Sequence, residues 1–223
     1  MTKRHSPNHD IRRTGPVDML VLHYTGMRSA AEALDRLVDP QAQVSAHYVV
    51  DEDGSIHALV PESRRAWHAG RSWWRGESDC NSRSIGIEIV NPGHEFGYRP
   101  FPGPQIEAVI RLCLGVLSRH SISPRNVVGH SDIAPTRKQD PGELFPWAQL
   151  KSYGIGLWPF SGSERAELPQ ETVLAMLNSY GYDVSEPAAA IAAFQRHFRP
   201  DLVDGVADAE TAGRLERLLI AAS

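Results

Sequence analysis

Apolar residues along the first two thirds of the chain follow patterns that predict alternating strands and helices. An apolar run over residues 17–22, ending at His23, is typical of a strand buried on both faces. Residues 29–40 begin with a capping box and end at a proline, which predicts a helix. Residues 46–60 hold two apolar stretches either side of an Asp-Glu-Asp-Gly turn at 51–54, which indicates a hairpin.

A further strand, a helix and a last short strand are predicted after the hairpin. Residues 84–90 alternate three isoleucines with other residues, so the isoleucines share one face of a strand and Glu88 points to the other. Pro104 opens a helix whose apolar residues recur at helical spacing. A last short strand at 127–128 precedes His130.

The chain divides into two predicted domains, at 10–160 and 165–223. Residues 135–169 are rich in Pro, Gly and Trp and are expected to be irregular. Three helical patterns follow, over 171–179, 187–198 and 208–221. We therefore expect an α/β first domain, with a mixed central sheet flanked by helices, and a small three-helix C-terminal domain.

Composition excludes several classes of protein. The 223 residues are 41% hydrophobic and 22% charged without a long apolar run, which excludes disorder and a membrane span. A net charge of -4 argues against a nucleic-acid partner. Two cysteines cannot build a disulfide scaffold. The basic start is followed by polar residues instead of the apolar stretch of a signal peptide, which predicts a cytoplasmic protein, or a periplasmic or outer-membrane-associated one if a leader has been removed.

Candidate chemistry lies at the ends of the strands. His23 and His130 each end a predicted strand, and Asp140 follows ten residues after His130. Two imidazoles and a carboxylate suit a catalytic zinc site, which keeps a fourth position open. Lys138 precedes Asp140 by two residues, so in an extended segment both side chains emerge on one face.

Five motifs together resemble the zinc-dependent N-acetylmuramoyl-L-alanine amidases of type 2. They lie at residues 22–25 (LHYT), 45–48 (SAHY), 66–70 (AWHAG), 84–88 (SIGIE) and 129–142 (GHSDIAPTRKQDPG). The chain is most similar to the branch that includes the AmpD and AmiD enzymes, because Asp140 stands where phage-lysozyme amidases and peptidoglycan recognition proteins have Cys.

The resemblance implies a function and a set of site residues. It implies that His23, His130 and Asp140 hold Zn²⁺, that Glu88 is the acid/base, and that Lys138 stabilises the transition state. The implied reaction cleaves the amide bond between N-acetylmuramic acid and L-alanine in peptidoglycan or muropeptides. Candidate substrate contacts are Tyr48, Trp67 and His68. Packing is an equal alternative for Trp67 and His68, and it is the favoured role for Tyr48, Trp73 and Trp74.

One position departs from the family pattern. Relatives often carry Arg just before the position of Cys80, and here that residue is Asp79. Arg71, Arg75 and Arg83 are candidate substitutes for a contact with a stem-peptide carboxylate.

The C-terminal domain resembles the three-helix peptidoglycan-binding domain at residues 177–182, 191–196 and 203–211. This resemblance implies that it holds the enzyme on its substrate, while a purely structural bundle is the alternative. Two alternative functions make different predictions for the whole chain. A non-catalytic peptidoglycan receptor predicts loss of a zinc ligand, and a structural zinc predicts four protein ligands.

Overall fold

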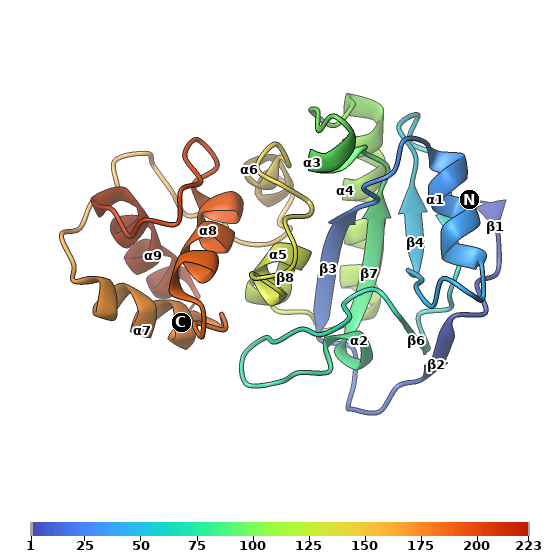
Figure 1. Ribbon diagram of the computed structural model, residues 1–223, viewed down its shortest axis with the longest axis horizontal. Coiled ribbons are helices and arrows are strands. Elements are labelled where there is room, and N and C mark those ends of the chain that lie inside the picture. Colours follow the sequence, from blue (N-terminus) through green and yellow to red (C-terminus); the bar gives the residue numbers. More distant parts are fainter. Residues whose placement is uncertain (1, 223) are drawn as a thin grey trace.

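A mixed six-stranded sheet forms the centre of the molecule (Figure 1). The computed structural model describes residues 2–222, so Ser223, the last residue of the predicted second domain, lies outside it. The strand order is β1-β5-β4-β7-β3-β8, with β4 antiparallel to β5 and the other neighbours parallel. The strands are β1 (Thr2–Lys3), β3 (Met19–Tyr24), β4 (Tyr48–Val50), β5 (Ile56–Ala58), β7 (Ser84–Ile89) and β8 (Val127–Gly129). A two-stranded ribbon pairs β2 (His9–Ile11) with β6 (Arg64–Ala66).

Helices pack on both faces of the sheet. The first part of the chain contains α1 (Ala30–Val38), α2 (Cys80–Arg83), α3 (Gly93–Phe96), α4 (Gly103–Arg119), a 3-10 turn (Pro124–Asn126), α5 (His130–Ile133) and α6 (Trp147–Ser152). The C-terminal helices are α7 (Gln170–Tyr180), α8 (Pro187–Phe198) and α9 (Ala209–Ala221). The apolar stripe of α4 shares a core with Ile87 on one face, whereas α1 packs against Val49 on the other. The predicted fold class is therefore confirmed.

The predicted strands and long helices are present with shifts of one or two residues at their ends. The prediction of an irregular stretch at 135–169 is wrong in one place, because α6 lies within it. This helix has only six residues, too few for a clear period, and it is fixed by the burial of Trp147 and Leu150 in the core. Cys80 and Cys113 are both buried and free. No helix within residues 2–222 is both long and apolar enough to cross a membrane.

The C-terminal helices share a core with the sheet. One continuous cluster joins Met19 and Val21 of β3 to Leu177 of α7 and Phe194 of α8 through the fully buried Trp74. Trp74 lies against Tyr180 and Tyr182, with ring centroids 5.8 and 5.3 Å away. In Figure 1 these helices, drawn in orange and red, lie beside α5 and β8 at one edge of the sheet. The two predicted domains are thus packed through a common apolar interior.

This shared core predicts cooperative unfolding of the whole chain. Leu177→Ala, at a fully buried position, should lower the free energy of unfolding by about 2–5 kcal/mol. Chemical denaturation followed by circular dichroism and tryptophan fluorescence should give one coincident transition, shifted to lower denaturant. Leu202→Ala, at a site 48% exposed in the same domain, is the control and should change little. Two separate transitions, with only the C-terminal one shifted, would contradict the common core.

Candidate active site

Three predicted ligand residues meet at the carboxyl ends of the central strands. His23 is the penultimate residue of β3, and His130 follows the neighbouring parallel strand β8. Their Nδ1 atoms are 2.9 Å apart, and each lies 3.0 Å from Oδ2 of Asp140. All three side chains are buried, and their ligand atoms are mutually close enough for a single metal ion. The predicted convergence of the three residues is therefore present.

Hydrogen bonds fix which nitrogen of each ring faces this centre. The Nε2–H of His130 donates to the carbonyl of Ala69 at 3.1 Å, so Nδ1 is the nitrogen that faces the centre, and in a neutral ring it carries the lone pair. The Ser84 hydroxyl donates to the carbonyl of Cys80 at 2.6 Å, so it accepts from His68 Nε2 at 3.1 Å.

This assignment sets the tautomer of His23. Because His68 donates through Nε2, its Nδ1 accepts from His23 Nε2 at 3.0 Å. The Nδ1 atoms of His23 and His130 and the Asp140 carboxylate then present only lone pairs to one another. These lone pairs repel one another when no cation lies between them, so the three side chains are suited to bind a metal ion.

Burial keeps the imidazoles of His23 and His68 neutral. It lowers the pKa of His23 to about 4, with a further lowering from His130. Burial likewise holds the pKa of His68 well below its usual range. Neutral imidazole is the form that binds metals, so His23 is ready for that role near pH 7.

His68 supports His23 from the wall of the cavity. Its two ring nitrogens are occupied by His23 and Ser84, and the side chain is buried. Its ring lies against Gly86, where an added Cβ would come within 2.4 Å of the His68 ring. The expectation that His68 binds substrate stays a prediction, because the side chain lines the cavity although both ring nitrogens already have protein partners. A glycine inside a buried strand was the sequence signal for this close approach.

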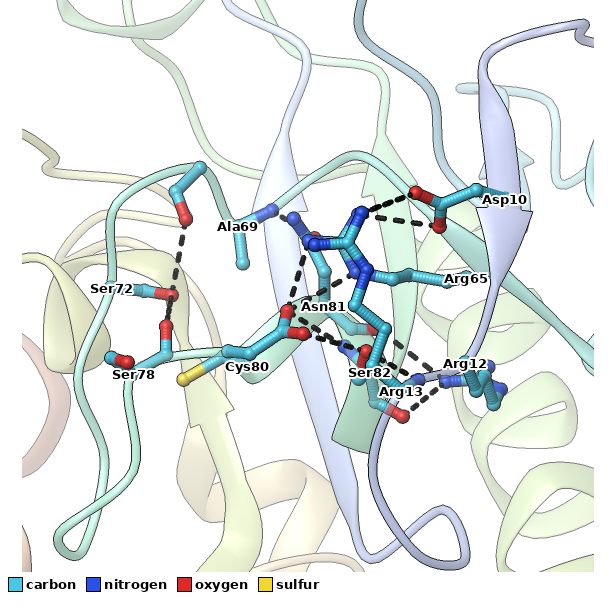
Figure 2. Close-up of polar contacts among 12 residues, drawn as sticks. Asp10, Arg12, Arg13, Arg65, Ala69, Ser72, Ser78, Cys80, Asn81 and Ser82 are labelled. Atoms are coloured by element: carbon cyan, nitrogen blue, oxygen red, sulfur yellow. Dashed lines mark hydrogen bonds and ion pairs between the residues drawn. The ribbon is translucent and has the colours of Figure 1, made fainter.

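The loop that carries His68 is held by α2 and the N-terminal segment. Asn81 Oδ1 accepts from the backbone N–H groups of His68 and Ala69, at 3.0 and 2.8 Å. Arg12 in turn donates to the carbonyls of Asn81 and Ser82, at 3.3 and 2.9 Å. Figure 2 shows Asn81 directed at Ala69 and Arg12 directed at the α2 turn. The sequence motifs gave no indication of either Arg12 or Asn81.

Asp79 has a structural role at the position where relatives often carry Arg. It caps α2 by accepting from Ser82, and it pairs with Arg65 at 2.9 Å. Arg65 also reaches Asp10, as Figure 2 shows. Of the candidate substitutes, Arg83 pairs with Asp18 and Arg75 donates to Asn126. Arg71 lines an outer groove beside the site, together with Arg137.

Glu88 and Lys138 line the same cavity as His130 and Asp140, and His23 contacts both of these predicted ligand residues. This cavity has a volume of about 470 Å³. Glu88 is paired in register with His23 across β7 and β3, so the two side chains lie on one face. Its Oε2 is buried without a hydrogen-bond partner among the described residues. Burial and the nearby Asp140 raise the pKa of Glu88 well above its usual range, while Lys138 opposes the shift.

The other two candidate substrate contacts, Trp67 and Tyr48, lie in different places. Trp67 lines the cavity, and its Nε1 is buried with no hydrogen-bond partner within residues 2–222. Tyr48 is not brought to the site: it pairs with Ile87, not Glu88, and therefore lies on the opposite face, where its hydroxyl donates to Glu62 at 2.7 Å. Trp74 packs in the core as expected, whereas Trp73 is 38% exposed and lines the outer groove.

Comparison with known proteins gives a consistent set of similarities. A family model described as N-acetylmuramoyl-L-alanine amidase matches residues 13–143. AmiD from Escherichia coli K12 is 43% identical, over 91% of this chain and 82% of its own length. The structure of E. coli AmiD with anhydro-N-acetylmuramic acid-L-Ala-D-γ-Glu-L-Lys superposes with a TM-score of 0.85 at 40% identity, covering 98% of this chain and 93% of that one. AmpDH3 from Pseudomonas aeruginosa, in complex with anhydromuramic pentapeptide, gives 0.83 at 35% identity, covering 96% and 94%.

The contact between Gly86 and His68 predicts that Gly86→Ala disturbs the metal centre. The new methyl group must displace the His68 ring, which releases His23 Nε2 from its acceptor. Loss of such an outer partner weakens metal binding by roughly 10–100-fold. Competition with a chelator would measure the zinc dissociation constant.

Gly15→Ala is the matched control, because an added Cβ there meets nothing within 4 Å. It should leave zinc affinity unchanged. Equal affinity in Gly86→Ala and the wild type would show that His68 does not hold His23 in place.

Proposed function

The chain belongs to the N-acetylmuramoyl-L-alanine amidase family, and on this premise we propose that it cleaves its muropeptide substrate with a zinc ion held by His23, His130 and Asp140. The family is metal-dependent, and its reaction is hydrolysis of the amide bond between N-acetylmuramic acid and L-alanine. The observation that carries the proposal is the convergence of His23 Nδ1, His130 Nδ1 and Asp140 Oδ2 in one cavity region with Glu88, whose Oε2 is buried without a partner among the described residues. Bound zinc supplies a Lewis acid that polarises a carbonyl and acidifies water.

The donor set favours a catalytic metal over a structural one. Two imidazoles and one carboxylate leave a fourth position open, as catalytic zinc sites do. Within residues 2–222, these three are the cluster of His, Cys, Asp or Glu side chains able to hold a metal. All three ligand positions are intact, which disfavours a receptor that only recognises peptidoglycan.

Glu88 is suited to carry the proton. Amide hydrolysis must move a proton from the attacking water to the leaving amine of L-alanine. A carboxyl whose pKa is raised by burial can accept and return a proton near neutral pH, which is typically worth roughly 10²–10⁴-fold in rate. The carboxylate Oε2, without a partner in the described protein, is free for this exchange.

Lys138 and Trp67 complete the proposed assignment. The Lys138 ammonium lines the cavity. Its positive charge would stabilise the negative charge that develops on the carbonyl oxygen as it becomes an oxyanion. The indole N–H of Trp67 offers a donor to the substrate from the cavity wall. Anhydro-muropeptides, which occupy the related AmiD and AmpDH3 structures, are the substrates proposed here.

The two domains are assigned different roles. Residues 10–160 carry the chemistry, and residues 165–223 form a peptidoglycan-binding-like domain of three helices, α7 to α9. A linked domain of this kind raises the local concentration of the enzyme at an insoluble polymer. The core that these helices share with β3 gives them a second, structural role that substrate binding alone does not require.

Glu88→Gln tests the proposed chemistry. The amide fills the same volume but cannot accept a proton, so turnover should fall by roughly two orders of magnitude or more while zinc content stays stoichiometric. The assay incubates zinc-loaded protein with anhydro-N-acetylmuramic acid-L-Ala-D-γ-Glu-L-Lys and measures the new L-alanine amino terminus. Metal content is measured on the same samples.

His23→Ala is the comparison variant, because it should lose both the zinc and the activity. Turnover of Glu88→Gln within a few-fold of the wild type would remove Glu88 from the mechanism. Full activity and full zinc in His23→Ala would refute the metal centre.

A further inference from the structure

A fully buried carboxylate connects the C-terminal domain to the metal centre. Asp132 lies in α5, two residues after His130, and is 0% exposed. Its Oδ2 accepts from the backbone N–H of Gly129 at 2.7 Å. The other two donors come from the C-terminal domain: the Tyr182 hydroxyl to Oδ1 and His197 Nδ1 to Oδ2, both at 2.7 Å.

The helix that carries His130 cannot hold its own orientation. α5 has only four residues, and a single turn is unstable without outside contacts. Charge-assisted hydrogen bonds to a buried carboxylate are strong and directional, whereas an unpartnered buried carboxylate is costly. The three donors on Asp132 therefore fix the turn that begins with His130.

The same turn also holds the third ligand residue. The backbone N–H of Ser131 donates to the carbonyl of Asp140 at 2.9 Å. Gly129 lies so close to Pro141 that an added Cβ would come within 2.7 Å of its ring. A shift of α5 is thus transmitted to both His130 and Asp140.

Aromatic packing keeps the two C-terminal donors in place. The His197 ring stacks on Trp147 with centroids 3.7 Å apart. The Tyr182 ring lies against Trp74, in the core shared with the sheet. Both donors are themselves buried, so water does not replace them at the carboxylate.

We propose that Asp132, Tyr182 and His197 are positioning residues through which the C-terminal helices set the orientation of His130 and Asp140. On this view the C-terminal domain is a structural part of the metal centre as well as a wall-binding domain. The inference deepens the proposed function and rests on it for one point, the assignment of His130 and Asp140 as ligands.

The test uses the full-length protein with cobalt or zinc and no substrate. A double variant, Tyr182→Phe with His197→Phe, keeps both aromatic rings and removes both donors. We expect zinc affinity, measured by chelator competition, to fall roughly 10–100-fold, and the visible spectrum of the cobalt-substituted protein to change. His197→Asn, combined with Tyr182→Phe, returns an N–H donor near the position of Nδ1 and should recover part of the affinity.

Leu215→Ala is the control for general destabilisation. Leu215 is fully buried in the C-terminal core and has no polar group, so its variant should lower the melting temperature without changing the cobalt spectrum. If the double variant does not fold, Tyr182→Phe alone gives the same comparison with a smaller expected loss.

The possible results distinguish failure of the positioning role from failure of the proposed function. The positioning role would be overturned if the Tyr182 and His197 variants kept zinc affinity within two-fold of the wild type and showed an unchanged cobalt spectrum. That result would leave the hydrolase assignment intact. Failure of the wild-type protein itself to bind either metal would refute the proposed metal centre, and the inference with it.

Discussion

The structure depends on holding three lone pairs against one another in a buried space. The Nδ1 atoms of His23 and His130 and Oδ2 of Asp140 lie 2.9–3.0 Å apart, and none of them donates a proton to another once their tautomers are fixed. This arrangement is unfavourable without a cation, so the surrounding protein must supply the free energy that maintains it. That cost explains why so much of the molecule is arranged around the site.

Residues on each side of His23, His130 and Asp140 hold these three side chains in position. His23 is oriented by His68 and Ser84, with Gly86 leaving room for the ring. His130 donates to the Ala69 carbonyl, in a loop that Asn81 holds from α2. The turn of α5 is held from the other side by the C-terminal domain. A centre fixed in this way needs little reorganisation on binding metal, which is the property that favours both affinity and catalysis.

Sequence patterns predicted residues that the fold brings together, but not the residues that hold them in position. His23, Glu88 and His130 follow from strand periodicity combined with family motifs, and Asp140 from the motif alone. Tyr48 was misplaced because strand register decides the face: one position separates the pairing with Ile87 from the pairing with Glu88. The contact of Tyr182 and His197 with Asp132 joins segments 50 and 65 residues apart, which no local pattern records.

The tautomers of the two histidines test the central claim most directly. Nitrogen-15 NMR of the ring nitrogens in zinc-loaded protein distinguishes a protonated nitrogen from one that binds the metal. We predict that His23 and His130 both carry hydrogen on Nε2, and that zinc shifts the Nδ1 resonances of both. Zinc-induced shifts confined to Nε2, or no shift in either ring, would contradict the account.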